Sequence, residues 1–303
     1  MRLKKREIRS FIIAFLLCLL PNAHAISDIR SSILAGTWYP AKKKELVNTI
    51  QRYLSNAKLP AINGNIKAII VPHAGYIYSG GVAAHSFKAI QGKDIKRVIM
   101  IGPSHRGFFS GASVNLQEAY KTPIGMVYVD RDFAKGLIKA SDTIHYVPMA
   151  HAFEHCLEIE LPFLQVVLKE FKIVPILLGE QDIHVCKELA RCILRLLRND
   201  PYSKNTLILA SSDLSHYHSY EEAVQMDQIV ADHVKNMDPY GLNHDLLNGR
   251  CEACGKGAII TTLIISRALG ANKAMVLKYA NSGDVTGDHS RVVGYMAAIL
   301  LKQ

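Results

Sequence analysis

The chain has 303 residues, of which 49% are hydrophobic, and this is enough for one large domain with a sizeable core. Its formal net charge is +10, but the basic residues are scattered and form no stripe with interleaved aromatic residues. This pattern argues against a nucleic-acid-binding protein, and the lack of an internal period argues against a repeat protein.

The first 25 residues have the pattern of a secretory signal peptide. Basic residues near the start precede an apolar run over residues 11–20, and Ala23-His24-Ala25 is a small-x-small cleavage site. We expect cleavage after Ala25 and export of the remaining single domain, residues 26–303, to the periplasm or the outside of the cell. The apolar run is short for a membrane-spanning helix, so an uncleaved membrane anchor is the alternative.

The mature chain begins with a loop over residues 33–40, because Gly36 and Pro40 interrupt any regular element there. This loop carries Trp38, the only tryptophan, which by itself indicates a packing residue. Residues 41–55 follow with apolar side chains at helical spacing and predict an amphipathic helix.

Three buried strands are predicted along the chain, and each is followed directly by a histidine-containing polar loop. The strands and the residues after them are 67–71 with His73, 97–102 with His105, and 206–210 with Asp213 and His216. Open α/β sheets bind ligands at the carboxyl ends of their strands. The sequence therefore predicts that the three histidines meet at one edge of one sheet, in a metal site or an acid–base site.

Two tyrosines follow the first of these histidines. Tyr76 and Tyr78 precede a glycine pair, and a helix is predicted over residues 81–90. The N-terminus of this helix would face the site and favour an anion there. We expect both tyrosines to contact the substrate.

The segment from His151 to His155 matches the H-x-x-E-H motif of inverted zinc peptidases. On a helix, His151 and His155 would share one face, with Glu154 as the general base. Pro162 limits any helix here, and no downstream carboxylate ligand stands out. The preferred interpretation is that Glu154, His155 and Glu158 form a buried polar network that supports the site from behind.

Elsewhere the chain alternates helices and strands, which predicts an α/β fold with a sheet flanked by helices. The predicted strands are 112–116, 126–129, 172–178, 275–280 and 292–300, and the predicted helices are 132–140, 163–169, 182–197, 221–235 and 258–269. A polar loop contains Asp284, Asp288 and His289, for which solvent exposure is the preferred interpretation over a place in the cleft.

Cysteine usage adds a third candidate ligand. Five cysteines follow the signal peptide, an odd number that leaves at least one thiol unpaired or intermolecular in an exported protein. Cys254 lies just before the apolar helix over residues 258–269, where the helix dipole would stabilise a thiolate, a good ligand for a soft metal. A disulfide between Cys251 and Cys254 is the alternative, and it would remove this ligand.

Taken in this order, the segments resemble the Memo family, also called AmmeMemoRadiSam system protein B. The resemblance covers nearly the whole mature chain and depends on AGTWYP (35–40), VPHAGYIYSG (71–80), IGPSHRG (101–107), EHCLEIELPFL (154–164), SSDLSHY (211–217) and CGKGAI (254–259). It implies a mixed sheet flanked by helices, as in the class III extradiol dioxygenases, which cleave catechol rings with non-haem Fe(II).

By this resemblance, His73, His105 and Cys254 are the metal ligands, and the cysteine stands where the dioxygenases use a glutamate. Asp213 and His216 match further cleft residues of the family, with His216 at the position of the acid–base histidine. Two imidazoles and a thiolate suit Fe(II), the expected metal, or copper, and they disfavour Mg²⁺ and Ca²⁺.

The resemblance also assigns Trp38 to the pocket rather than to the core. We therefore predict a dioxygenase-like oxidoreductase acting on a small or aromatic substrate. The alternatives are a non-catalytic protein that binds a metal or a phosphorylated ligand, small molecule or peptide, and a hydrolase acting through His151 and His155. The signal peptide departs from a usually intracellular family, and export would separate the protein from a radical-SAM partner.

Overall fold

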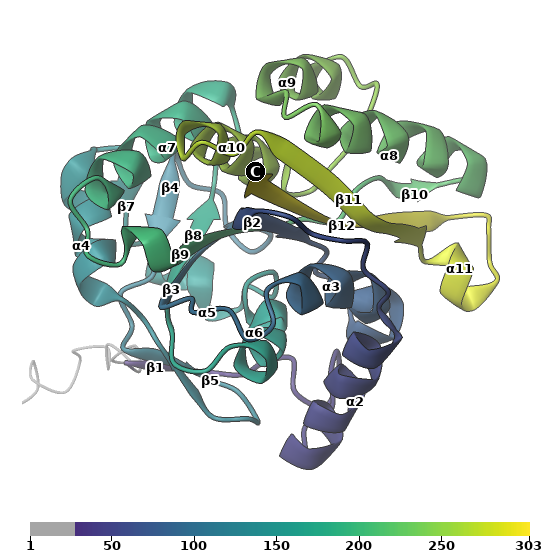
Figure 1. Ribbon diagram of the computed structural model, residues 1–303, viewed down its shortest axis with the longest axis horizontal. Coiled ribbons are helices and arrows are strands. Elements are labelled where there is room, and N and C mark those ends of the chain that lie inside the picture. The colour runs from purple at the N-terminus through teal and green to yellow at the C-terminus, as the bar shows by residue number, and fades with distance from the viewer. Residues whose placement is uncertain (1–27) are drawn as a thin grey trace, which may run out of the picture.

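The computed structural model describes residues 28–303, so the predicted signal peptide lies outside the described residues. Residues 28–303 form a mixed α/β structure around a nine-stranded sheet, with strand order β10-β12-β2-β9-β3-β8-β4-β7 and β11 also paired with β12 (Figure 1). The predicted α/β fold with a mixed sheet flanked by helices is confirmed. Within this range, no helix combines the length and the apolar character needed to cross a bilayer.

The large sheet has a parallel centre with antiparallel flanks. Its strands are β2 (Asn65–Val71), β3 (Arg97–Pro103), β4 (Ala112–Val114), β7 (Ile144–His145), β8 (Lys172–Leu178), β9 (Thr206–Ser211), β10 (His216–His218), β11 (Lys273–Asn281) and β12 (Val292–Lys302). Strands β2, β9, β3 and β8 run parallel, while β12 and β4 flank them antiparallel. Central parallel strands are covered on both faces, which explains their continuous apolar sequences. A separate small sheet contains β1 (Ile29–Ser31), β5 (Ala119–Lys121) and β6 (Met126–Tyr128).

Helices cover both faces of the large sheet (Figure 1). One face packs against α4 (Arg131–Ala140), α7 (Ile183–Leu197), α8 (Tyr220–Lys235), α9 (Pro239–Leu247) and α10 (Lys256–Ala268), and the other against α2 (Lys43–Asn56), α3 (Tyr76–Ala89) and α6 (Leu161–Val167). Short helices α5 (Pro148–Ala152) and α11 (Gly283–Thr286) and two 3₁₀ turns (Glu158–Glu160 and Ser203–Asn205) complete the described chain. Alternate side chains of β2 supply the two cores, Ile70 on the α10 face and Ile69 and Val71 on the α3 face.

The helix after His73 begins earlier than predicted. Helix α3 begins at Tyr76, so Gly80 lies inside it and faces Tyr53 of α2. A Cβ at position 80 would lie 2.9 Å from Cε2 of Tyr53, so the glycine permits close packing of two helices rather than marking a helix start. The other predicted helices and strands are present, with ends shifted by at most a few residues.

Candidate metal centre

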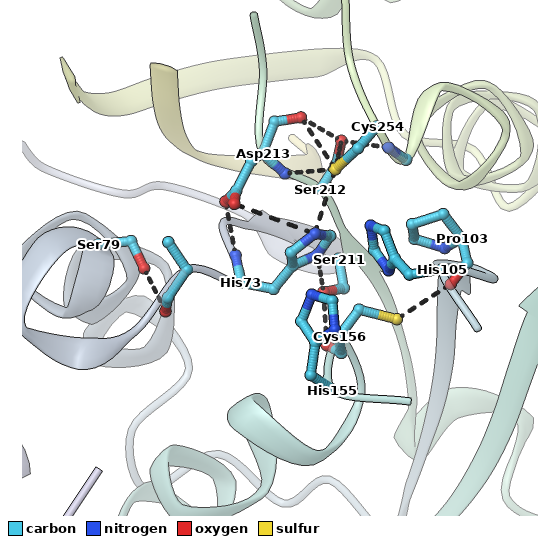
Figure 2. A network of polar contacts seen from close by, with 12 residues as sticks. His73, Ser79, Pro103, His105, His155, Cys156, Ser211, Ser212, Asp213 and Cys254 are labelled. Atoms are coloured by element: carbon cyan, nitrogen blue, oxygen red, sulfur yellow. Dashed lines mark hydrogen bonds and ion pairs between the residues drawn. The ribbon is translucent and has the colours of Figure 1, made fainter. Parts of the chain in front are cut away.

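The candidate site lies at the carboxyl ends of three neighbouring parallel strands. His73 follows β2, His105 follows β3, and Asp213 follows β9, which lies between the other two strands. Cys254 reaches the same place from the residues that precede α10 (Figure 2). The topology therefore brings together residues that are up to 181 positions apart in the chain.

Three potential ligand atoms converge at this edge. The ligating atoms of His73, His105 and Cys254 all lie within 4.8 Å of one another. Nε2 of His73 is 3.1 Å from Sγ of Cys254, and the two imidazole rings stand nearly at right angles with centroids 5.2 Å apart. Metal–ligand bonds of about 2.0–2.3 Å place two ligands of one ion roughly 3–4 Å apart. The separation of His73 and Cys254 matches this range, and the three residues form a group that could hold one metal ion.

Glu154 orients the His105 ring. Its carboxylate accepts a hydrogen bond from the backbone N–H of His105 at 2.6 Å and lies 2.9 Å from Nδ1 of the same residue. Burial opposes the charge on Glu154, but the hydrogen bonds from His105 prevail and lower its pKa to about 2. A carboxylate can only accept, so we assign the proton of His105 to Nδ1, which leaves Nε2 free to bind a metal.

A similar arrangement holds His73, through a residue that the sequence did not single out. Nδ1 of His73 lies 2.9 Å from Oγ of Ser211, the last residue of β9. The Ser211 hydroxyl also contacts the Cys156 carbonyl at 2.7 Å and a Glu160 carboxyl oxygen at 2.9 Å. Ser211 therefore accepts from Nδ1 of His73 and directs Nε2 towards Cys254 (Figure 2).

Burial governs the charge state of two of the ligands. It lowers the pKa of His73 to about 3, with a further contribution from His105, so this imidazole is neutral at neutral pH. Burial and then the Asp213 carboxylate raise the pKa of the Cys254 thiol well above its usual range. Without a bound metal, burial therefore outweighs the stabilisation of a thiolate that we expected from the helix dipole. A bound cation would reverse this, since a coordinating thiol is deprotonated.

Asp213 and His216 lie beside these ligands. Oδ1 of Asp213 accepts a hydrogen bond from the backbone N–H of His73 at 2.8 Å, and Oδ2 is 4.0 Å from its Nε2. Burial raises the pKa of Asp213 to about 6. Nδ1 of His216 lies 2.7 Å from the Leu214 carbonyl and so donates to it. In the neutral ring, Nε2 of His216 is therefore the nitrogen that can accept a proton.

A cleft of about 580 Å³ opens over these residues, and we refer to it below as the cleft. His73, His105, Asp213 and His216 line its floor, and its walls are largely apolar and aromatic. The wall residues are Thr37, Trp38, Ala74, Gly75, Ile77, Tyr78, His155, Tyr217, Val293 and Tyr295. Tyr217 adopts a φ of 65°, a strained conformation for a tyrosine, and such strain is concentrated at functional sites.

A family model described as Memo-like protein matches residues 30–299. The chain belongs to the Memo-like family. A "MEMO1 family protein" from Methanobrevibacter smithii is 38% identical over 281 residues, covering 89% of this chain and 99% of the relative. Relatives of the same description from Nitrosopumilus maritimus and Methanocaldococcus jannaschii are 36% identical over 274 residues and 35% identical over 289 residues. These alignments cover 89% and 91% of this chain, and 98% and 100% of the relatives.

In this Memo-like protein, the two tyrosines after His73 have different environments. Tyr78 is 42% exposed and lines the cleft, as expected of a substrate contact. Tyr76 is buried, and its hydroxyl donates to the Ile159 carbonyl at 2.9 Å. The expectation that Tyr76 contacts the substrate is therefore corrected, because α3 begins at this residue and turns its side chain into the core.

His155 also has a different place from the one expected. It lines the cleft, with ring centroids 4.4 Å from His105 and 5.4 Å from His73, so it does not lie behind the site. Its other neighbour is Trp38, at 4.8 Å. Burial and then His73 lower the pKa of His155 to about 3, which makes it a neutral wall residue.

Glu158 supports the wall of the cleft rather than the ligands. Its carboxylate binds the Arg30 guanidinium and accepts from the hydroxyls of Ser32 at 2.7 Å and Tyr39 at 2.8 Å. These contacts fix the segment that carries Trp38. Glu158 is therefore a positioning residue for this loop, whereas Glu154 positions a ligand directly.

The inverted-peptidase geometry is not formed. Helix α5 ends at Ala152, before Glu154 and His155, so the predicted shared helix face does not exist. Nε2 of His151 is buried against Oγ of Ser113 at 3.0 Å, and His151 belongs to none of the metal-capable groups in residues 28–303. Cys251 and Cys254 are both free thiols in this structure, so the alternative disulfide is not formed either.

Proposed function

We propose that this protein is a metal-dependent, dioxygenase-like oxidoreductase that acts on a small or aromatic substrate. The observation that carries the proposal is the convergence of His73, His105 and Cys254 beside a cleft. His216 also lines this cleft, and its Nδ1 bonds to the Leu214 carbonyl, so its Nε2 is the nitrogen available to a substrate. Two imidazoles and a soft thiol suit Fe(II), which we take as the expected metal, or copper.

When bound, such a metal would supply redox chemistry toward O₂ and would polarise a substrate oxygen. The protein would supply the proton transfer. Nδ1 of His216 is held by the Leu214 carbonyl, so its Nε2 is the nitrogen that can take a proton from a substrate hydroxyl. Asp213 fixes the loop after β2 through the backbone N–H of His73 and keeps a second carboxylate oxygen near the ligands.

The walls of the cleft favour an aromatic substrate. Trp38, Tyr78, Tyr217 and Tyr295 all line it, and aromatic rings pack well against one another in offset or edge-to-face contacts. A volume of about 580 Å³ accommodates a small aromatic molecule and also the end of a peptide.

The test uses anaerobically purified protein loaded with Fe(II), with O₂ uptake measured over a panel of phenols and catechols. We expect the wild type to take up O₂. Cys254→Ala should lose its bound iron, measured by elemental analysis, and should no longer take up O₂. His216→Gln should keep the iron but lose activity by about 10²–10⁴-fold, because only the proton acceptor is removed. Full activity of His216→Gln would contradict its acid–base role.

The thiol ligand favours a second candidate, a protein that holds a metal or a phosphorylated ligand without turnover. Cysteine replaces the carboxylate expected of the dioxygenases, and a thiolate is a preferred ligand of Cu(I). Tight binding of one metal ion per chain, with no O₂ uptake on any substrate of the panel, would select this candidate.

We also propose that the protein is exported and acts apart from radical-SAM partners. The proposal is supported by the signal-peptide pattern of residues 1–25. Mass spectrometry of the native protein should find a chain that begins at Ile26 in the periplasmic or extracellular fraction. A full-length chain in the membrane fraction would instead indicate an uncleaved anchor.

A further inference from the structure

The three candidate ligands do not border the same open space. His73 and His105 line the cleft, whereas Cys254 lines a second cavity of about 260 Å³. His216 lines both cavities and so stands between them. We call the second space the thiol-side cavity, and its remaining lining residues are Leu214, Leu246, Cys251, Glu252, Ala253 and Lys256.

This arrangement gives the metal position two approaches. A substrate in the cleft covers the imidazoles of His73 and His105, but it leaves the thiol-side cavity open. Cys254 is partly exposed, and its Sγ is only 3.1 Å from Nε2 of His73. An ion that reaches the thiol through the second cavity is therefore already close to the first imidazole.

The wall of the thiol-side cavity carries groups that can attract or bind a passing metal ion. Glu252 is 45% exposed at its side chain, and its carboxylate lies 3.1 Å from Nε2 of His218. Cys251 adds a second sulfur to the lining. Lys256 is the one Lys or Arg among these lining residues, and it opposes the negative charge of Glu252.

We propose that the thiol-side cavity is the route by which a metal ion reaches Cys254, with Glu252 attracting the ion and Lys256 opposing its approach. Charged groups that line the approach to a binding site act on the rate of association more than on the final occupancy. This inference depends on the metal site of the proposed function, but not on catalysis by it.

The first test measures the rate of Co(II) binding to the metal-free protein under anaerobic conditions. Stopped-flow absorbance of the thiolate-to-Co(II) charge-transfer band reports both the rate and, at its end point, the occupancy. Glu252→Lys should bind Co(II) about tenfold more slowly and Lys256→Gln faster, with equal end points, and both effects should shrink at high salt. Glu170→Lys, the same charge change in an exposed residue before β8 at the other end of the sheet, should leave the rate unchanged.

The second test blocks each approach in turn. Leu246→Trp fills the thiol-side cavity and should slow Co(II) binding severalfold, while Ile77→Trp, at a 69% exposed cleft residue, should not. The reverse pattern would overturn the proposal, as would Glu252→Lys and Lys256→Gln changing the rate in the same direction. If every variant bound Co(II) to the normal end point and at the wild-type rate, only the proposed route would be overturned. A wild type that develops no charge-transfer band would overturn the metal site itself and the route with it.

Discussion

The two ends of the parallel strands both border a large cavity, yet they are built differently. A cavity of about 560 Å³ lies at the amino ends of β3 and β8, and the cleft of about 580 Å³ lies at the carboxyl ends of β2, β3 and β9. Cavity volume therefore does not distinguish the candidate site from the opposite end. What distinguishes them is how the buried polar groups are paired.

At the amino ends, Arg97 has a carboxylate partner on each side. Its guanidinium contacts Asp130 at 2.7 Å and Asp200 at 2.8 Å. At the carboxyl ends, His73 and His105 contact Ser211 and Glu154 through Nδ1, and their remaining nitrogens converge with the Cys254 thiol. A guanidinium paired with carboxylates on both sides indicates a structural cluster, whereas imidazole nitrogens and a thiol that converge on one point indicate a site.

Of the variants that test this difference, Arg97→Ala should have the largest effect. Removal of the guanidinium leaves two largely buried carboxylates without their partner, which should cost about 3–5 kcal/mol in the free energy of unfolding, measured by urea denaturation. The affinity of the folded variant for metal should not change. Arg191→Ala, which removes an exposed ion pair with Glu188, should cost less than about 1 kcal/mol. Equal costs for the two variants would contradict the structural role of the Arg97 cluster.

At the opposite end, Glu154→Gln should weaken metal binding by about 10–100-fold, measured by competition with a chelator of known affinity. The amide is a weaker acceptor for Nδ1 of His105, so the ring is less well oriented and less basic. Glu158→Gln is the matched control, because its carboxylate binds Arg30 and the loop of Trp38 rather than a ligand. If Glu158→Gln weakened metal binding as much, the distinct role of Glu154 would be lost.

Ser211→Ala should have a smaller effect of the same kind, about tenfold in metal affinity, because His73 loses the acceptor for its Nδ1 proton. Ser86→Ala provides the comparison in another fully buried serine, whose hydroxyl donates to the Ile70 carbonyl at 3.0 Å away from the ligands. That control should lower stability and leave metal affinity unchanged. An unchanged affinity in Ser211→Ala would show that His73 needs no such support.

Tyr76→Phe should show the smallest effect. It removes the hydrogen bond to the Ile159 carbonyl and should cost about 1 kcal/mol of stability, with no change in the KM for substrate. Tyr78→Phe keeps the fold and alters a cleft residue, so any change in KM should appear there. If Tyr76→Phe raised the KM and Tyr78→Phe did not, Tyr76 rather than Tyr78 would be the substrate contact.

The convergence of His73 and His105 was predictable because the cause is local. An apolar run that ends in a polar loop predicts a strand end, and the parallel sheet brings such ends together. The environment of Tyr76 was not predictable, since the helix expected over residues 81–90 begins at Tyr76 instead, and Gly80 serves the packing of α3 against Tyr53. Ser211 and Glu160 carry no local signal either, because only the pairing of β2 with β9 brings Ser211 beside His73.

The insertion of β9 between β2 and β3 has a consequence for when the site can form during folding. The strands that carry His73 and His105 are consecutive in the chain, but β9 separates them in the sheet, and Cys254 comes later still. Such non-local pairings are intrinsically slow to form, because long loops must close before they gain any contact. A chain that ends before residue 254 lacks the complete ligand set. A metal that binds only the native state stabilises that state as a whole. Metal binding would therefore stabilise the completed domain rather than help to start its folding.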